Sequence, residues 1–192
     1  MRYSIITPTL VRPTLRRLAD SIYAQTAAND WEWLICVDVP LVVFPEKKKL
    51  VEELAKDPRV HVHRCGVQHR NYGNTCRNQA HDRAKGDYLY FIDDDDYLAD
   101  AEALRTLQQV TADWAIFPIM RCGNLWFCEP PGMGRTGSGM FLYKRALGVR
   151  YPDVPDYSAD GMLAEQLLKY PYQALRDERP LMIYPQRGLG KE

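Results

Sequence analysis

The sequence has no net charge, no Cys-x-x-Cys pair and no apolar run long enough to cross a bilayer. Its 25 Lys and Arg residues balance 25 Asp and Glu residues, so no overall field attracts nucleic acid or an anionic membrane, and no nucleic-acid partner is expected. The five cysteines are odd in number, which argues against a disulfide framework and a zinc knuckle. Reduced thiols in a cytoplasmic protein are therefore expected.

No targeting or transmembrane segment is expected either. Met1 leads directly into a strand-like segment, without the charged and apolar regions of a signal peptide. Contact with the surface of a membrane stays open, as does the choice between a monomer and a homo-oligomer. With 192 residues, of which 46% are hydrophobic and 26% charged, the chain is typical of one globular domain over residues 1–192.

Strand and helix patterns alternate over residues 1–110. Apolar runs predict strands, and helical spacing predicts helices between them, over Tyr3–Thr7, Thr14–Ala24, Trp31–Val37, Pro45–Ala55, Val60–His63, Gly73–Lys85, Tyr88–Ile92 and Ala101–Val110. This alternation predicts an α/β fold with a Rossmann-like, mostly parallel sheet flanked by helices. Pro8 is expected to end the first strand, and Gly86 is expected to cap the third helix.

Residues 111–192 follow a less regular pattern. Strands are expected over Trp114–Pro118, Gly139–Tyr143 and Leu181–Tyr184. A helix is expected to begin after an N-cap at Ser158 and to run to Lys169. Between these segments the chain is rich in glycine and proline, so connections of irregular structure are expected there.

Four consecutive aspartates, Asp93–Asp96, follow directly on the apolar run Tyr88–Ile92. Such a cluster repels itself unless a positive charge lies within it, and hard oxygen ligands suit Mg²⁺ or Mn²⁺. A solvated acidic turn is the alternative, but the apolar residues on both sides argue against a free loop. Because parallel strands end at one edge of a sheet, Pro8, Asp38 and Asp93 are expected to lie close together there.

These segments, in this order, resemble glycosyltransferase family 2, which has the GT-A fold. Ser4–Leu10 is similar to the opening strand of the family. Asn71–Gly73, Arg77-Asn78 and Ala84–Leu89 are similar to its central block, and Asp93–Asp96 to its DxD-type motif. The resemblance covers roughly the first hundred residues and is looser afterwards. It implies a GT-A type fold with a mixed, mostly parallel sheet.

The resemblance also implies an activity. A metal-dependent, hexosyltransferase-like enzyme would transfer a sugar from a nucleotide-diphosphate sugar, with a UDP-sugar favoured, to a hydroxyl of a carbohydrate or glycan acceptor with inversion. Residues 1–110 would bind the nucleotide-sugar and Mn²⁺ or Mg²⁺, and residues 111–192 the acceptor. Asp95 is the implied metal ligand, Asp96 is the better of its two neighbours, and Asp93 would contact the metal through water or the ribose.

Six residues are implied to bind the nucleotide: Pro8, Thr9, Asp38, Arg77, Asp93 and Asp94. Asp38 would contact the base, although Val39-Pro40-Leu41 stands where the family usually has a second aspartate and Gly-Ser. A plain loop residue is the alternative for Asp38, and a surface pair with Asp82 is the alternative for Arg77.

An inverting transfer needs a base for the acceptor hydroxyl. The family places this base at a late helix start, where Asp160 is the first choice and Glu165 the second; a carboxylate that only stabilises the helix start is the alternative. Gly132–Gly139 resembles the acceptor-side loop or is a plain connection. Trp126 and Phe127 would stack on a sugar or belong to the core.

Two other functions remain open at this point. A degenerate, non-catalytic nucleotide-sugar binder fits a chain that is short for the family. A nucleotidyltransferase would share a similar sheet, but it needs a glycine-rich loop after the first strand, and Pro8–Pro13 contains no glycine.

Overall fold

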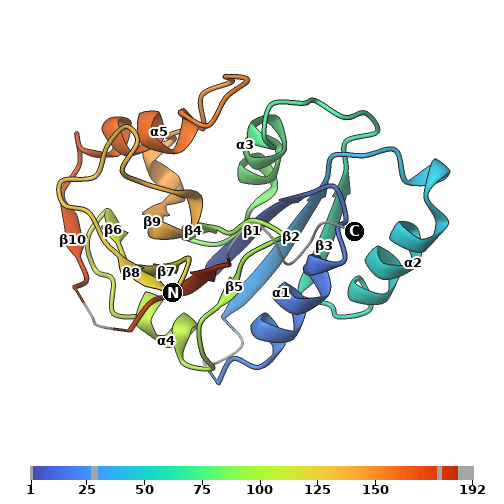
Figure 1. Cartoon of the computed structure of the whole chain (residues 1–192), viewed down its shortest axis with the longest axis horizontal. Coiled ribbons are helices and arrows are strands. Elements are labelled where there is room, and N and C mark those ends of the chain that lie inside the picture. Colours follow the sequence, from blue (N-terminus) through green and yellow to red (C-terminus); the bar gives the residue numbers. More distant parts are fainter. Residues whose placement is uncertain (1, 27–29, 177–178, 186–192) are drawn as a thin grey trace.

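The computed structural model describes residues 2–26, 30–176 and 179–185. Within these residues a seven-stranded sheet has the order β10-β6-β9-β4-β1-β2-β3 (Figure 1). In that order its strands are Tyr172–Ala174, Trp114–Ile116, Phe141–Lys144, Tyr88–Phe91, Tyr3–Thr9, Trp31–Val37 and Val60–Arg64. The sheet therefore joins strands from both halves of the chain.

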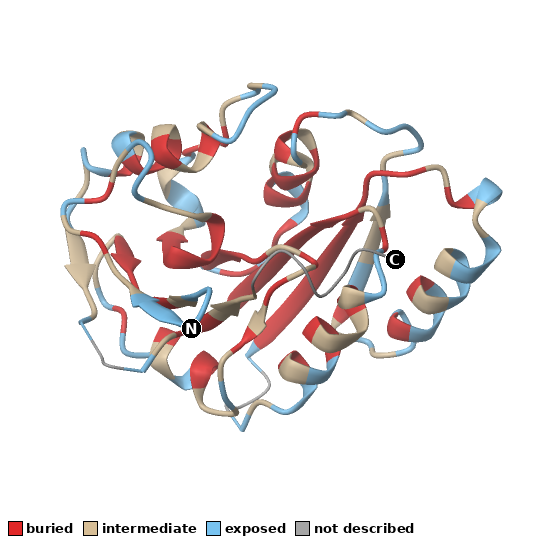
Figure 2. Cartoon of the chain, in the orientation of Figure 1, coloured by how far each residue is buried: buried red, intermediate tan, exposed pale blue. Residues whose placement is uncertain are grey.

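The central strands β4, β1, β2 and β3 run parallel to one another. β9 is antiparallel to both β4 and β6, and β10 is parallel to β6. Every residue of β1 and β2 is buried, as Figure 2 shows in red, which is typical of strands covered on both faces. The mixed, mostly parallel sheet that the sequence predicts is confirmed.

Helices α1 (Thr14–Tyr23), α2 (Pro45–Leu54) and α3 (Asn74–Arg83) connect the parallel strands. α3 lies on one side of the large sheet, and α1 and α2 lie on the other (Figure 1). Two further helices, α4 (Ala103–Leu107) and α5 (Ala159–Leu167), follow β4 and β9 in the chain. α4 is shorter than the expected Ala101–Val110 helix.

A second sheet, which the sequence does not predict as a unit, has the order β5-β11-β7-β8. Its strands are Tyr97–Leu98, Met182–Tyr184, Ile119–Arg121 and Asn124–Trp126. Strands of two or three residues are too short to establish the alternation by which a strand is recognised. Short 3₁₀ turns complete the chain: η1 (Leu41–Val43), η2 (Ser138–Met140) and η3 (Arg145–Leu147).

The expectation that Pro8 ends β1 is wrong, because the strand continues to Thr9. Ile92 donates its backbone N–H to the carbonyl of Ile6, and Asp38 donates to the carbonyl of Thr9. The backbone N–H and C=O groups of even-numbered residues of β1 therefore point toward β4, and those of odd-numbered residues point toward β2. β4 is paired with β1 only as far as Ile6. The missing N–H of Pro8 therefore points beyond the end of β4 and removes no ladder hydrogen bond.

Gly86 does not cap α3 as expected. The helix ends at Arg83, and Ala84 already has extended backbone angles, φ −60 and ψ 135. A Cβ at Gly86 would instead lie 2.5 Å from the backbone nitrogen of Ser4. This glycine is needed because the chain passes directly against β1 at that point.

Ser158 precedes α5 as expected, but its side chain makes no capping hydrogen bond. Its hydroxyl donates to Asp156 in the turn before the helix.

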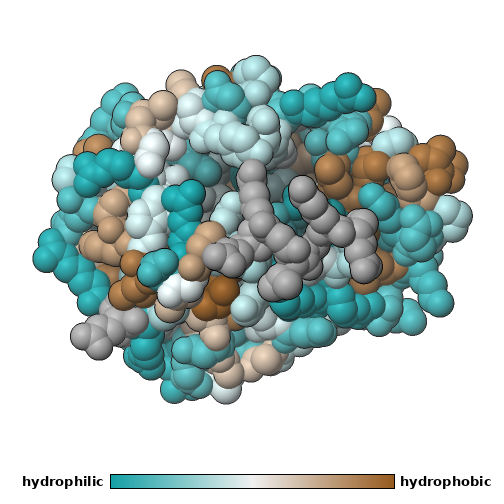
Figure 3. All heavy atoms as spheres, in the orientation of Figure 1, coloured by the Kyte–Doolittle hydropathy of each residue, from teal (hydrophilic) through white to brown (hydrophobic). Residues whose placement is uncertain are grey.

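No helix among the described residues is long and apolar enough to cross a membrane. Two valines of η1, Val42 and Val43, are 87% and 60% exposed and form an apolar spot on the surface beside α2 (Figure 3).

Candidate active site

The carboxyl ends of β1, β2 and β4 meet at one edge of the large sheet, as the parallel order requires. The hydroxyl of Thr9, at the end of β1, donates a hydrogen bond to Asp94, just beyond the end of β4. The aspartate run therefore has a fixed position relative to the end of β1, and Pro8 lies one residue before this contact.

The four aspartates divide into two groups. One oxygen from each of Asp93, Asp95 and Asp96 lies within 4.8 Å of the other two. Asp94 is 0% exposed and faces Thr9 and Arg12, whose Nη2 is 3.1 Å from its Oδ1. Burial raises the pKa of Asp94 to about 6, and the charge of Arg12 opposes that rise. Asp94, which was predicted to bind the nucleotide, is thus fully buried against Thr9 and Arg12. The three predicted metal ligands converge without it.

Three arginines neutralise part of this cluster. Arg12 Nη1 lies 2.6 Å from Asp95 Oδ2, and Arg17 donates to the Asp95 backbone carbonyl over 2.7 Å. Arg77 donates to Asp93. Charge-assisted hydrogen bonds of this kind hold carboxylates in one orientation, so the loop after β4 is held by the β1–α1 connection, by α1 and by α3.

Asp96 is the carboxylate that these arginines leave without a hydrogen bond. It is 1% exposed, and neither of its oxygens has a hydrogen-bond partner among the described residues. Burial, followed by the charges of Asp93 and Asp95, raises the pKa of Asp96 well above its usual value. A buried carboxylate without a partner is costly, and a divalent cation between these three residues would offset that cost. The residues present therefore fit a bound metal ion.

Arg77 is a buried residue and does not form the surface pair with Asp82 that the sequence left open. It is 4% exposed and donates to the carbonyl of Tyr72 over 2.7 Å and to Asn74 Oδ1 over 3.1 Å. Asp82 pairs instead with Arg150 at 2.6 Å. Arg77 thus links the first turn of α3 to the aspartate cluster.

Asp38 follows β2 at the same edge and is 5% exposed. Its Oδ1 accepts hydrogen bonds from the backbone N–H of His69 over 3.0 Å and from His69 Nδ1 over 2.5 Å. Asp38 is therefore held by His69, a residue without a predicted role. It lies in the loop after β2, but it is buried there.

The two candidate bases lie on α5 in different environments. Asp160, in the first turn, is partly buried, and burial raises its pKa to about 6 while the charge of Arg77 opposes the rise and that of Asp93 adds to it. Glu165 is exposed. Five residues correspond to roughly 140° around a helix, so Glu165 points away from the face that carries Asp160. The second choice of the sequence analysis does not join the site.

The family model of glycosyl transferase family 2 matches residues 4–166. The chain belongs to this family. No curated protein shows significant sequence similarity to it. Among solved structures, TarS 1-349 from S. aureus superposes with a TM-score of 0.79 at 17% identity, over 96% of this chain and 60% of that one.

Two further solved structures with a similar fold are complexes with nucleotide-sugars. TarS 1-349 in complex with UDP-GlcNAc has a TM-score of 0.77, 18% identity and coverage of 97% and 59%. The mannosyltransferase PcManGT from Pyrobaculum calidifontis, in complex with GDP-Man and Mn²⁺, has a TM-score of 0.71, 16% identity and coverage of 97% and 58%. The family 2 chain thus spans about three-fifths of these chains, and the likeness confirms the GT-A type fold.

Asparagines of α3 hold the segment that leads to α5 in this family 2 chain. Asn78 donates to the carbonyl of Tyr151 over 2.9 Å and accepts from its N–H over 3.0 Å. Asn74 donates to the carbonyl of Val154 over 3.1 Å. Because this segment directly precedes α5, its attachment to α3 helps to position Asp160 relative to Arg77.

The glycine-rich loop of the family 2 chain packs against the start of α5. A Cβ at Gly161 would lie 2.6 Å from Met133 Cα, and within the loop Thr136 donates to the Gly132 carbonyl over 3.1 Å. The loop therefore packs closely against the first turn of α5. Trp126 and Phe127 pack partly buried against the core, in agreement with the core alternative.

Sequence reasoning missed Arg12, Arg17 and His69. A signal for the arginines was present, because four adjacent carboxylates need positive partners and the segment after the first strand carries them at the predicted edge. His69 gave no such signal, since only the folded loop brings it to Asp38.

Proposed function

We propose that this chain is a metal-dependent glycosyltransferase that transfers a hexosyl group from a nucleotide-diphosphate sugar to a hydroxyl of a carbohydrate acceptor with inversion. The observation that carries the proposal is the buried carboxylate of Asp96, which has no hydrogen-bond partner among the described residues and lies beside Asp93 and Asp95. The complexes of TarS with UDP-GlcNAc and of PcManGT with GDP-Man and Mn²⁺ support a nucleotide-sugar donor and manganese.

In this proposal Asp93, Asp95 and Asp96 hold Mn²⁺ or Mg²⁺. When bound, the ion neutralises the charge that develops on the leaving diphosphate, a contribution worth several kcal/mol in such reactions. Arg77 keeps Asp93 in its orientation, and Arg12 and Arg17 do the same for Asp95. Pro8, Thr9 and Asp38 line the strand ends on the side of the nucleoside, for which we favour uridine.

We assign Asp160 as the base that accepts the proton of the acceptor hydroxyl. A pKa of about 6 leaves it ionised at neutral pH and still basic enough to take a proton as the hydroxyl attacks. Its place near Arg77 and Asp93 puts it beside the donor end of the site. An inverting displacement requires attack on the face opposite the leaving diphosphate, which α5 and the glycine-rich loop would present to the acceptor.

A thermal-shift screen tests the donor and metal parts of the proposal. Wild type is measured with UDP, GDP and their sugars in Mn²⁺, Mg²⁺ or EDTA. At least one nucleotide is expected to stabilise the protein more with Mn²⁺ than with EDTA, and Asp95→Ala is expected to remove the difference. Equal shifts in wild type and Asp95→Ala would contradict the metal site.

Donor consumption tests transfer itself. The nucleotide-sugar that gives the largest shift is incubated with candidate acceptors, and release of the nucleotide diphosphate is followed. Wild type is expected to release it, and Asp160→Asn to release far less. Manganese-dependent binding without consumption in either protein would identify a binder instead of an enzyme.

A further inference from the structure

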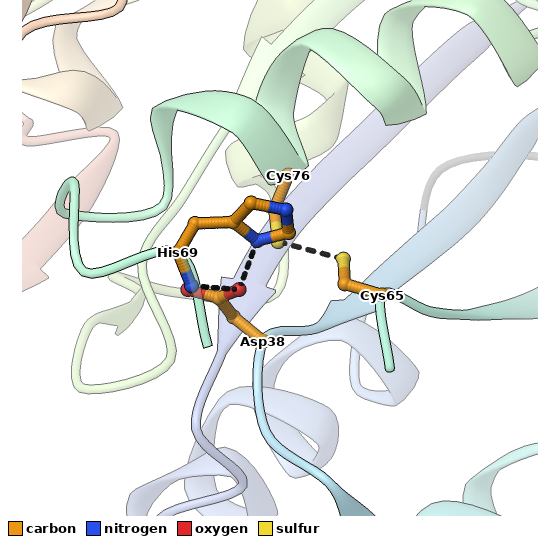
Figure 4. Close-up of side chains that lie close together, drawn as sticks. All are labelled: Asp38, Cys65, His69 and Cys76. Carbon is orange, nitrogen blue, oxygen red and sulfur yellow. Dashed lines mark hydrogen bonds and ion pairs between the residues drawn. The ribbon is translucent and has the colours of Figure 1, made fainter. Parts of the chain in front are cut away.

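A second group of metal-ligating side chains lies beside the aspartate cluster. Asp38, Cys65, His69 and Cys76 each offer one ligand atom, and these atoms lie within 4.8 Å of one another (Figure 4). They come from four separate places: the end of β2, the residue after β3, the following loop and the first turn of α3. Their convergence is a property of the fold, because no two of them are adjacent in the sequence.

The four side chains already contact one another in pairs. The sulfur atoms of Cys65 and Cys76 are 3.0 Å apart, and His69 Nδ1 is 2.5 Å from Asp38 Oδ1. Asp38 and Cys76 are buried, and Cys65 and His69 are partly buried. The hydrogen bond between the two sulfurs lowers the pKa of Cys65 and raises that of Cys76.

The chemistry of this group differs from that of the aspartates. Two sulfurs, an imidazole and a carboxylate are ligands of tetrahedral Zn²⁺, whereas an all-oxygen cluster suits Mg²⁺ or Mn²⁺. A disulfide between Cys65 and Cys76 would involve the two sulfurs alone, whereas a cation would also use the ligand atoms of His69 and Asp38 that lie close to them. The ligand types therefore favour a cation.

We propose that Asp38, Cys65, His69 and Cys76 form a four-ligand Zn²⁺ site that is separate from the aspartate cluster. Zn–S bonds of about 2.3 Å place two sulfurs of a tetrahedral site roughly 3.8 Å apart, so zinc would widen the present sulfur pair by less than about 1 Å. Each cysteine loses its proton when the ion binds, and the proton of neutral His69 moves to Nε2.

Such a site would fix the loop between β3 and α3. That loop contains Arg70 and Tyr72 with positive φ values of 57 and 55, a strained conformation for residues with a side chain that needs support from its surroundings. Cys76 is followed directly by Arg77, which holds Asp93. Zinc would therefore stabilise the part of α3 from which Arg77 reaches the reaction site, and the second oxygen of Asp38 would remain for the nucleoside.

Metal analysis of the full chain tests the site. Protein purified without chelator and dialysed is expected to retain about one zinc per chain, and Cys65→Ser and Cys76→Ser are expected to lose most of it. Cys128→Ser is the matched control, because Cys128 is also buried but bonds to the Arg135 carbonyl. Asp95→Ala must keep its zinc. This result distinguishes the zinc site from the aspartate cluster, and it does not depend on whether the proposed transferase activity is found.

Cobalt gives a second measurement that needs no variant. Co²⁺ added to metal-free wild type is expected to produce a thiolate-to-cobalt charge-transfer band and the visible bands of tetrahedral Co²⁺, and added Zn²⁺ should remove both. No charge-transfer band in folded, reduced wild type would overturn the proposal. So would a Cys65–Cys76 disulfide in the purified protein that, once reduced, takes up neither Zn²⁺ nor Co²⁺.

Discussion

Gly73 lies directly over Pro8, so that a Cβ at position 73 would come within 2.6 Å of the Pro8 Cβ. Gly73 precedes α3 and has a φ of +80, which residues with a side chain rarely adopt. The contact allows the first turn of α3 to lie against the end of β1, and from this turn Arg77 reaches Asp93. The close approach of these two residues thus sets the position of a charge in the site.

Gly73→Ala is expected to destabilise the protein through both the backbone strain and the contact with Pro8. Gly123→Ala is the matched control, because Gly123 also has a φ of +80 but has nothing within 4 Å of its Cβ position. Strain alone costs roughly 1–2 kcal/mol in each variant, and overpacking adds about 1–3 kcal/mol at position 73. Thermal unfolding should therefore give a larger loss for Gly73→Ala, and equal losses would show that the contact is unimportant.

Asp96→Asn is expected to stabilise the protein when no metal is present. The pKa of Asp96 is raised in the folded state by burial and by its acidic neighbours, so its ionisation costs stability. Below the pKa of the unfolded chain, near 3.8, that cost is absent, and it grows as the pH rises through and above this value. In EDTA the variant should melt higher than wild type at pH 7.5, and the gain should shrink towards pH 4.

Manganese should reverse this order, because the ion compensates the charge of Asp96 in wild type and has lost one ligand in Asp96→Asn. The measurement is a thermal melt of both proteins in EDTA and in Mn²⁺ with nucleotide diphosphate. A wild type that stays the less stable protein under every condition would argue against a cation at Asp96.

The large sheet and the edge that carries the site could be predicted from the sequence, because β1, β2 and β4 are short, mostly apolar segments and the apolar run of β4 leads into four aspartates. The small sheet could not, since strands such as β5 (Tyr97–Leu98) are too short to establish the alternation by which a strand is recognised. The distinction between Asp94 and Asp96 was also out of reach. The two residues are of the same type in one acidic run, and it is the folded contacts of Thr9 and Arg12 with Asp94 that distinguish it from Asp96.

Asn78→Ala is expected to lower turnover while nucleotide binding remains. Asn78 makes both of its hydrogen bonds to the backbone of Tyr151, at 2.9 and 3.0 Å, and so holds the segment before Asp160. Loss of these bonds costs about 1–3 kcal/mol of stability and should reduce kcat more than it changes the manganese-dependent melting shift.

Asn124→Ala serves as the control for Asn78→Ala, because Asn124 is exposed and makes a single long hydrogen bond of 3.4 Å to Cys122. It should leave both kcat and the melting shift unchanged. A parallel loss of nucleotide binding and turnover in Asn78→Ala would mean that α3 itself is disturbed, and would count against a role in positioning α5.

The activity of wild type is expected to rise with pH through about 6, because the pKa of Asp160 is raised to about 6 by burial and only its ionised form accepts a proton. The measurement is kcat/KM for donor consumption from pH 4.5 to 8. Asp160→Asn should lose about 10²–10⁴-fold in kcat and also the rise of kcat/KM with pH, whereas Glu165→Gln, on the exposed face of α5, should keep both.

Ionisation of Asp160 costs stability as the pH rises through about 6. Asp160→Asn should therefore melt no lower than wild type at pH 7.5, and unfolding would not explain its loss of activity. A normal pH profile in Asp160→Asn would exclude this residue as the base.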